Sequence, residues 1–280
     1  MRKNLVKIFF VCLIFFPSFV SATNISDYVT FGADSYWCNS TNAIFELPDD
    51  FNFQGNFSLL SPASGRVLSY SLGAGKELNF KTISINGIFC GVYASNYVSN
   101  SGEASFSCRP FAHLTTFVDI QLEVGYNYTV HKELRRDKIL PCHSIRLGSG
   151  ISVLQNTSLA FSYTDFFYEP FFFDESLFEN IEDEAVNQNY KLSGALGIIP
   201  KFPRSVFDLS LSHLLFDSLN TYVSYSRIGY ALDTLFVNSI VLGADYYILQ
   251  NINLGIAHNI MFLQNSAISN YTSINIAVNF

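Results

Sequence analysis

Apolar and polar residues alternate along residues 118–130, with an apolar side chain at every even position and a polar residue or glycine at every odd one. A period of two is typical of a β-strand whose two faces meet different surroundings. Asp119, Gln121 and Glu123 stand on the polar face of this segment. Unpaired carboxylates are too costly for a packed apolar core, so this face is predicted to meet water.

Shorter segments with the same period recur along the chain. They span residues 67–72, 83–89, 145–153, 159–163, 190–198, 207–211, 221–228, 252–262 and 272–280. Short breaker clusters separate several of them, as turns separate strands, and no linker rich in Pro, Gly or Ser divides the chain. The pattern predicts an all-β fold of one closed antiparallel sheet with about 12 strands, within a range of roughly 10 to 14.

The last of these segments ends on an aromatic residue. Ile276, Val278 and Phe280 share one face of the predicted strand, and the residues between them are small or polar. This resembles the C-terminal strand of bacterial outer-membrane β-barrels, which ends on an aromatic residue after alternating apolar positions. The resemblance implies a transmembrane β-barrel surrounded by outer-membrane lipid. It also implies that these three residues are the signal read by the barrel assembly machinery.

Residues 1–22 have the features of a secretory signal peptide: a basic start, a short apolar stretch and small residues before the cleavage point. The apolar stretch is shorter than the ~20 residues of a membrane-spanning helix, and Pro17 interrupts it. We expect cleavage after Ala22 and export through the periplasm to the bacterial outer membrane. Residues 23–280 are then one barrel domain.

The composition favours a barrel wall over the alternative of a secreted β-sandwich. The chain is 49% hydrophobic and only 14% charged, whereas about 25% charged is ordinary for a globular domain. After residue 22 no apolar run is long enough for a spanning helix, so the apolar residues are finely distributed. Residues 246–280 contain no Asp, Glu, Lys or Arg. A barrel wall can lack charge for so long, because hydrocarbon excludes charge outside and the lumen requires only polarity.

The charge balance excludes some partners. Removal of the signal peptide leaves 13 basic residues against 23 acidic ones, a formal charge of −10, with no basic cluster. Nucleic acids and anionic bilayer surfaces both require counter-charge. Neither is therefore expected as a partner, whereas small polar solutes are compatible with the chain.

Of the 5 cysteines, Cys12 belongs to the signal peptide, which leaves an even number for an oxidising compartment. Three connectivities are then open. Cys90 and Cys108 lie symmetrically about a turn-like segment, and in a regular hairpin they would approach the ~5.5–6 Å Cα separation of a disulfide. Cys38 would then pair with Cys142. Two disulfides are predicted, and free buried thiols are the alternative.

A long loop at residues 166–189 interrupts the strand pattern and carries an acidic run. Apolar residues spaced by four in its second half suggest a short amphipathic helix that begins at Asp174. Its acidic side could be a solvated surface, or a constriction inside the lumen that disfavours anions. Counting strands back from Phe280 places this loop at the periplasmic end, where loops are usually short. The acids are Asp174, Glu175, Glu179, Glu182, Asp183 and Glu184.

Catalytic and metal-binding motifs give little support to an enzyme. The sequence has no phosphate-binding Gly-rich loop, no zinc-protease helix and no Gly-x-Ser-x-Gly turn. Cys142 and His143 are adjacent, but they lack the spacing of a metal site. No cofactor is expected. The histidines share no motif: His113, His131, His143, His213 and His258.

Three functions from different classes remain open. A porin-like channel for passive diffusion of small polar solutes is the leading hypothesis, because the barrel would have a polar lumen. A surface or structural barrel, such as an adhesin or antigen, would use the acidic loop as its exposed part. A hydrolase acting on lipid or lipopolysaccharide would require a catalytic histidine near the rim.

Overall fold

The computed structural model describes the strands and most of their turns. The described ranges are residues 22–32, 37–47, 49–61, 67–80, 82–94, 97–110, 118–133, 138–154, 156–169, 203–216, 218–230, 236–249, 251–263 and 268–279. Residues 1–21 of the predicted signal peptide, residues 170–189 of the predicted loop with its expected helix, the predicted strand at 190–198, and Phe280 lie outside these residues. The predicted start of the loop at residue 166 was wrong, because residues 166–168 belong to the strand that ends at Tyr168.

The described residues form strands and turns, with no helix among them. The strands are β1 (Ala22–Gly32), β2 (Trp37–Leu47), β3 (Phe51–Ser61), β4 (Val67–Phe80), β5 (Ile83–Ala94), β6 (Tyr97–Cys108), β7 (Val118–Glu133), β8 (Lys138–Val153), β9 (Thr157–Tyr168), β10 (Pro203–Leu215), β11 (Leu219–Tyr230), β12 (Phe236–Leu249), β13 (Ile252–Leu263) and β14 (Ile268–Asn279). Consequently, no helix in this part of the chain is long and apolar enough to cross a bilayer.

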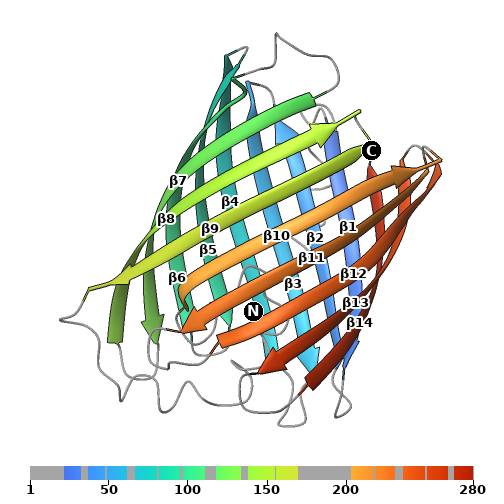
Figure 1. Cartoon of the computed structure of the whole chain (residues 1–280). Coiled ribbons are helices and arrows are strands. Elements are labelled where there is room, and N and C mark those ends of the chain that lie inside the picture. The colour runs from blue at the N-terminus through green and yellow to red at the C-terminus, as the bar shows by residue number, and fades with distance from the viewer. Residues whose placement is uncertain are drawn as a thin grey trace.

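Every strand pairs antiparallel with its neighbours in the sequence, and β1 pairs with β14, so the sheet closes into a barrel (Figure 1). The closing pair runs in register from Asn24 opposite Asn279 to Gly32 opposite Tyr271. Closure removes both free edges, which would otherwise expose unpaired backbone groups. The prediction of an all-β antiparallel barrel is confirmed.

The described barrel has the strands β1 to β14, which is more than the central prediction of about 12 and lies at the upper limit of the predicted range. Several of the strands that were not recognised lack a clean alternation. In β2 the outward positions Asn39 and Thr41 are polar, and in β1 the outward position Asp27 is charged. These residues break the apolar half of the pattern on which strand recognition depends.

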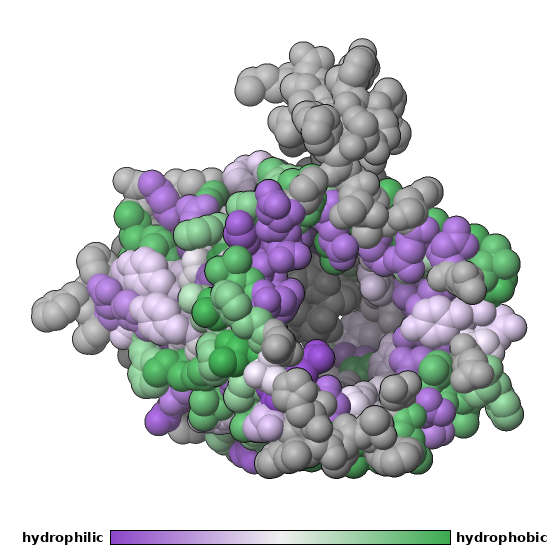
Figure 2. Space-filling view, turned by 90° about the horizontal axis from the view of Figure 1, so that it is seen from above, coloured by the Kyte–Doolittle hydropathy of each residue, from purple (hydrophilic) through white to green (hydrophobic). Residues whose placement is uncertain are grey.

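The two faces of the sheet differ in polarity. On β14 the outward side chains Ile274 and Ile276 are 51% and 45% exposed, whereas Ser273 and Asn275 on the other face line a cavity inside the barrel. Figure 2 shows hydrophilic residues around the central hollow and many hydrophobic residues on the outer side. The molecule is therefore inverted relative to a soluble protein, with apolar residues outside and polar residues inside.

The connections sort into two ends. Tight turns follow β2, β4, β8, β10 and β12, and Ala22 and Asn279 lie at this same end. Leu154 and Phe216 take positive φ angles of 53° and 54° in two of these turns. Tyr168 at the end of β9 and Pro203 at the start of β10, between which the long loop runs in the sequence, lie at the opposite end. The expectation that this loop shares an end with the C-terminus was wrong, since it followed from a miscounted strand number.

Candidate functional site

The inner wall carries the polar face that the sequence predicts for β7. Gln121 and Glu123 line a cavity of about 380 Å³, whose other walls are β8, β9 and β10. Asp119 lies nearer the start of β7, where its Oδ2 is 3.7 Å from Nε of Arg109. The three residues thus share one face, on the side of the sheet opposite the exposed apolar residues Leu122 and Val124.

Arg146 is surrounded by acids on this inner wall. Its Nη1 lies 3.7 Å from Oε1 of Glu123 on the adjacent strand β7. Gly125 separates it from Glu103 on β6, because a methyl group on this glycine would lie 3.6 Å from Cβ of Arg146 and 3.7 Å from Oε1 of Glu103. The absence of a side chain at Gly125 leaves room for these charged groups, and the group as a whole is acidic.

Asp208 on β10 lines the same cavity and is held by hydroxyl groups. Ser226 donates to Oδ1 at 2.5 Å, and Ser162 donates to Oδ2 at 3.3 Å. Hydrogen bonds to a carboxylate stabilise its charged form. In the part of the chain that the structure describes, no cation forms an ion pair with Asp208, so its charge remains available to the lumen.

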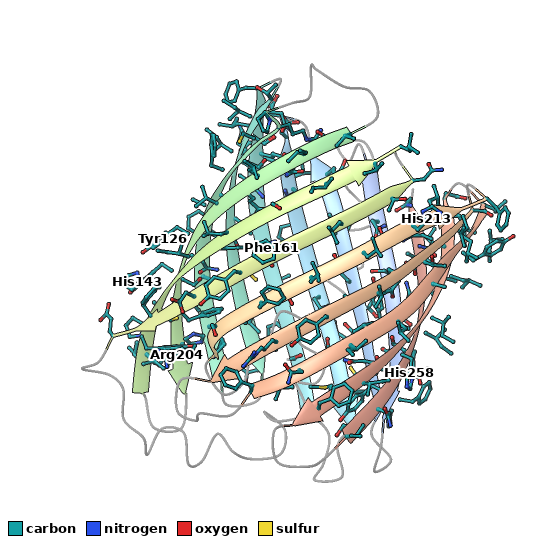
Figure 3. The ribbon with its side chains drawn as sticks, viewed as in Figure 1. Tyr126, His143, Phe161, Arg204, His213 and His258 are labelled. Atoms are coloured by element: carbon teal, nitrogen blue, oxygen red, sulfur yellow. The ribbon has the colours of Figure 1, made fainter. Side chains whose placement is uncertain are left out.

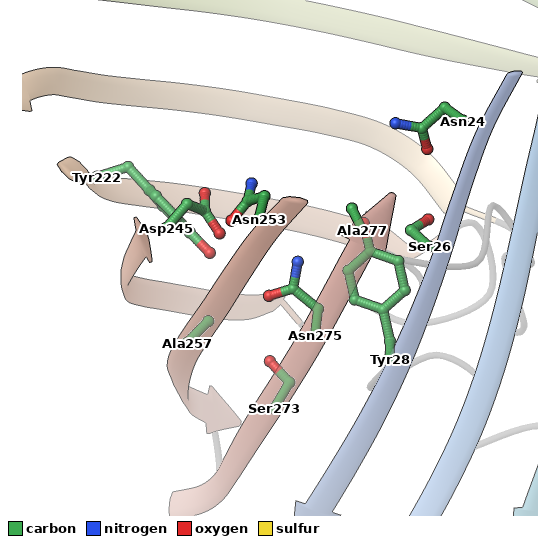
Figure 4. Close-up of a pocket in the computed structure, with 10 residues that line it drawn as sticks. All are labelled: Asn24, Ser26, Tyr28, Tyr222, Asp245, Asn253, Ala257, Ser273, Asn275 and Ala277. Carbon is green, nitrogen blue, oxygen red and sulfur yellow. The ribbon is translucent and has the colours of Figure 1, made fainter. Parts of the chain in front are cut away.

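A second cavity of about 290 Å³ lies against β11 to β14 and β1 (Figure 4). We call it the tyrosine niche and define it by Tyr28, Tyr222, Asp245, Asn253 and Asn275. These residues come from five strands, and Asn24 and Ser26 extend the polar lining along β1. Sequence reasoning missed the niche, because its members are brought together only by strand pairing and by barrel closure.

Among the described side chains, the inner face carries more acids than bases. Arg146 faces inward in the middle of β8, among the acids. Arg109 and Arg204 lie at strand ends, just after β6 and at the irregular start of β10. Among the described side chains, the inward-facing acids are Glu46, Glu77, Glu103, Asp119, Glu123, Asp208 and Asp245.

The predicted disulfide between Cys90 and Cys108 was wrong. Cys90 lies opposite Ser101 and Cys108 lies opposite Ile83, so the two thiols are far apart along the hairpin of β5 and β6. They also point to opposite faces, Cys90 into the lumen and Cys108 outward. The sequence-based prediction assumed a turn centred between residues 96 and 102. The observed turn comes earlier, since Ala94 pairs with Tyr97, and this shifts Cys108 away from Cys90.

The second predicted disulfide is also absent. Cys38 on β2 and Cys142 on β8 form no disulfide, are only 1% and 3% exposed, and lie on strands that are not neighbours in the barrel. No disulfide is present among the described residues. The alternative of buried thiols without disulfides fits Cys38 and Cys142, whereas Cys90 and Cys108 are only partly buried.

Three of the candidate histidines stand on the outer wall. His143 is hydrogen-bonded to Oη of Tyr126 at 2.6 Å and lies 3.6 Å from Glu169 (Figure 3). Nδ1 of His213 lies 2.8 Å from the Thr157 hydroxyl, and Nδ1 of His258 lies 3.0 Å from that of Thr272.

These three histidines are carried by the separate strands β8, β10 and β13. His131 faces inward on β7, whereas His113 lies outside the described residues. Within the described ranges, no group of three or more His, Cys, Asp or Glu residues could hold a metal ion.

Ile276 and Val278, two residues of the expected assembly signal, lie on the outer face of β14, opposite Asp27 and Ile25 of β1. Phe280 lies outside the described residues. The acids of the long loop also lie outside them: Asp174, Glu175, Glu179, Glu182, Asp183 and Glu184.

No family model matches the chain, and no curated protein matches it. Solved structures with a similar fold exist. The outer membrane protein OprD from Pseudomonas aeruginosa matches with a TM-score of 0.50 and 8% identity, over 94% of this chain and 95% of that one.

Two further porins match over almost their whole length. The KdgM porin has a TM-score of 0.45 and 6% identity, over 92% of this chain and 99% of the porin. The NanC porin has a TM-score of 0.47 and 7% identity, over 91% and 98%. At such low identities the OprD match shows a shared barrel fold and nothing about the solute.

Proposed function

We propose that this protein is a porin-like channel of the bacterial outer membrane, through which small polar solutes diffuse passively. The observation that carries the proposal is the closed barrel with an apolar outer face and a polar inner face. An apolar outer face is stable in hydrocarbon, and closure satisfies the backbone groups of every strand. The same arrangement leaves polar groups along the interior.

The size of the barrel supports a channel. Barrels of about 8 strands have interiors filled by side chains, whereas those of about 16 to 18 strands leave an aqueous channel. The sheet of β1 to β14 lies towards the wider end of this range. Gly125, Gly148 and Gly150 on the inner face near Arg146 also leave space that larger side chains would fill.

The charges of the lumen favour cations over anions. Acids on β2, β4, β6, β7, β10 and β12 face the interior, and Arg146 is outnumbered by its acidic neighbours Glu103 and Glu123. A cleft lined by one sign of charge in low-dielectric walls concentrates ions of the opposite sign. We therefore propose a preference for cationic and neutral solutes.

The expectations for export and assembly belong to the same proposal. Residues 1–22 act as a signal peptide, and residues 276, 278 and 280 are read by the assembly machinery after passage through the periplasm. In outer-membrane barrels the tight turns face the periplasm and the longer loops face outward. The segment from residue 169 to residue 202 is then on the cell surface.

Reconstitution in planar bilayers tests the channel. Under a KCl gradient, the wild-type barrel is expected to conduct and to show a reversal potential of the sign for cation preference. The double variant Glu123→Gln/Asp208→Asn is expected to lose much of that preference, because it removes two luminal charges without changing side-chain size.

Asp27→Asn is the matched control, since Asp27 lies on the outer face of β1 and its neutralisation should leave the reversal potential unchanged. Folded barrels that carry no current would contradict the channel. Conducting barrels that prefer chloride would contradict only the charge argument.

A further inference from the structure

Four residues of the inner wall share one register row across the seam of the barrel. Asp245 on β12 lies opposite Gly255 on β13, Gly255 opposite Asn275 on β14, and Asn275 opposite Tyr28 on β1. Strand neighbours lie about 4.8 Å apart, so the row is a continuous band of side chains at one depth of the lumen. Closure of β1 on β14 completes it.

Small residues form the floor of the tyrosine niche. A methyl group on Gly255 would overlap Oδ1 of Asn275 and Oδ1 of Asp245, and a methyl group on Gly243 would overlap the ring of Tyr222. The larger side chains therefore lean over these glycines towards each other (Figure 4). They converge on one concave space rather than standing apart along the wall.

The hydrogen-bonding groups of the niche lack partners. Oδ1 of Asn253 is buried and accepts no hydrogen bond. Among the described residues, no cation pairs with the carboxylate of Asp245. Buried polar groups in proteins are usually satisfied, and an unsatisfied acceptor beside an unpaired carboxylate calls for a donor from outside the chain.

The niche differs in this respect from the cavity between β7 and β10. There Arg146 already balances Glu123 at 3.7 Å, and the hydroxyls of Ser162 and Ser226 already donate to Asp208. In the tyrosine niche the oxygens of Asp245, Asn253 and Asn275 have no comparable partner. Single unsatisfied oxygens also occur elsewhere on the described wall, at Asn86 and Asp119, but in the niche an unsatisfied amide oxygen and an unpaired carboxylate line the same cavity.

We propose that the tyrosine niche is a binding site for a small organic cation that carries both an ammonium group and hydroxyl groups. The ammonium group, with three donors and a positive charge, binds the carboxylate of Asp245 and the amide oxygens of Asn253 and Asn275. The body of the solute packs on Tyr28 and Tyr222, whose rings attract cations and whose hydroxyls bond to polar substituents.

The volume of the niche favours an organic solute over a bare ion. The cavity has a volume of about 290 Å³, which is close to the ~300 Å³ of the smallest ligand pockets. A bare metal ion would require several oxygens at 2.0 to 2.6 Å, as roughly found for Mg²⁺ and Ca²⁺ sites, and one carboxylate in so wide a space does not provide them. The site rests on the proposed channel, in which it would hold a solute transiently during passage.

A ligand-observed NMR titration of the folded barrel in detergent tests the site, with glucosamine as the cationic probe and glucose as its neutral counterpart. Wild-type protein is expected to bind glucosamine at least about tenfold more tightly than glucose, the equivalent of about 1.4 kcal/mol for the charged contact. Asp245→Asn should remove this difference and leave the affinity for glucose almost unchanged.

Asp208→Asn is the matched control, because it neutralises a luminal acid outside the niche. The control should keep the affinity of the wild type for glucosamine. Equal binding by Asp245→Asn and wild type, an equal loss in Asp208→Asn, or equal affinity for the two sugars would each overturn the site. Tyr222→Phe, which keeps the ring over Gly243, should weaken the binding of both sugars modestly, because it removes a hydroxyl that bonds to their polar substituents.

The experiment separates this site from the channel itself, because NMR binding requires no conduction. Glucosamine binding that depends on Asp245 in a barrel that conducts no ions would refute the channel and leave the site standing. Cation-selective conduction without glucosamine binding would refute the site and leave the channel standing.

Discussion

At the scale of single residues, the inner wall depends on where side chains are missing. Gly243 lies beneath the Tyr222 ring, and Gly255 lies beneath the oxygens of Asp245 and Asn275. Neither glycine has a positive φ, so backbone conformation does not require glycine here. The reason for glycine is the close approach of the larger neighbouring side chains. Gly87 on the outer face of β5 has no such neighbour.

We expect Gly243→Ala to destabilise the barrel by about 1–3 kcal/mol, the usual cost of forcing an extra methyl group into an occupied space. The Tyr222 ring must move for the new side chain to fit. Gly87→Ala is the control, since its Cβ would lie no closer than 4.0 Å to the carbonyl oxygen of Glu103.

Denaturant unfolding of both variants in lipid vesicles measures the difference. A Gly243→Ala barrel as stable as the Gly87→Ala barrel would show that the Tyr222 ring is not held over the glycine.

At the scale of the element, the alternation of each strand decides what a side chain can reach. Cys90 and Cys108 both have even numbers, but even-numbered residues of β5 pair with odd-numbered residues of β6. The two cysteines therefore lie on opposite faces of the sheet. Asp27 on the outer face of β1 shows a second effect of pairing. Its carboxylate accepts hydrogen bonds from Thr41 at 2.8 Å and Asn39 at 3.1 Å, so the partner strand compensates a charge on the apolar side.

The cysteines should therefore differ in their reactivity. A small charged thiol reagent added to barrels in vesicles should modify Cys90, which faces the lumen, whereas Cys108 should react with a membrane-soluble maleimide. Cys38 and Cys142, at 1% and 3% exposure, should react only after unfolding.

Mass spectrometry of the labelled protein, with Cys90→Ser and Cys108→Ser as controls, identifies each site. A reduction-dependent change in gel mobility of the monomer would contradict the free thiols.

At the scale of the whole molecule, stability depends on closure. The seam between β1 and β14 joins strands from the two ends of the sequence, which no local contact can hold together. Bringing these two strands together has a large loop-closure entropy cost. This cost becomes smaller once the strands between them have already paired.

Ile276→Pro should prevent closure, because proline removes a backbone donor from a strand that is paired on both sides. Folded outer-membrane barrels resist detergent and migrate faster than heated samples on gels. The variant is expected to lose most of the fast-migrating band, whereas the control Ile276→Val should keep it. A normal band for Ile276→Pro would mean that β14 is not an interior strand of a closed sheet.

The sequence by itself determined the architecture and its polarity. Period-two alternation in residues 118–130 and 272–280 requires a sheet with two unlike faces, and it put Gln121 and Glu123 on the polar side. This signal is local, because each residue alternates with its own neighbours. It failed in β1 and β2, where Asp27 and Asn39 occupy outward positions.

Only the tertiary structure decided the strand number, the absence of disulfides among the described cysteines and the tyrosine niche. Each depends on register between strands, and register is set by the cooperative fit of the whole sheet rather than by any one segment. Asp245 and Tyr28 show this most clearly. They are at opposite ends of the chain, and they share a row in the wall only because the last strand pairs with the first.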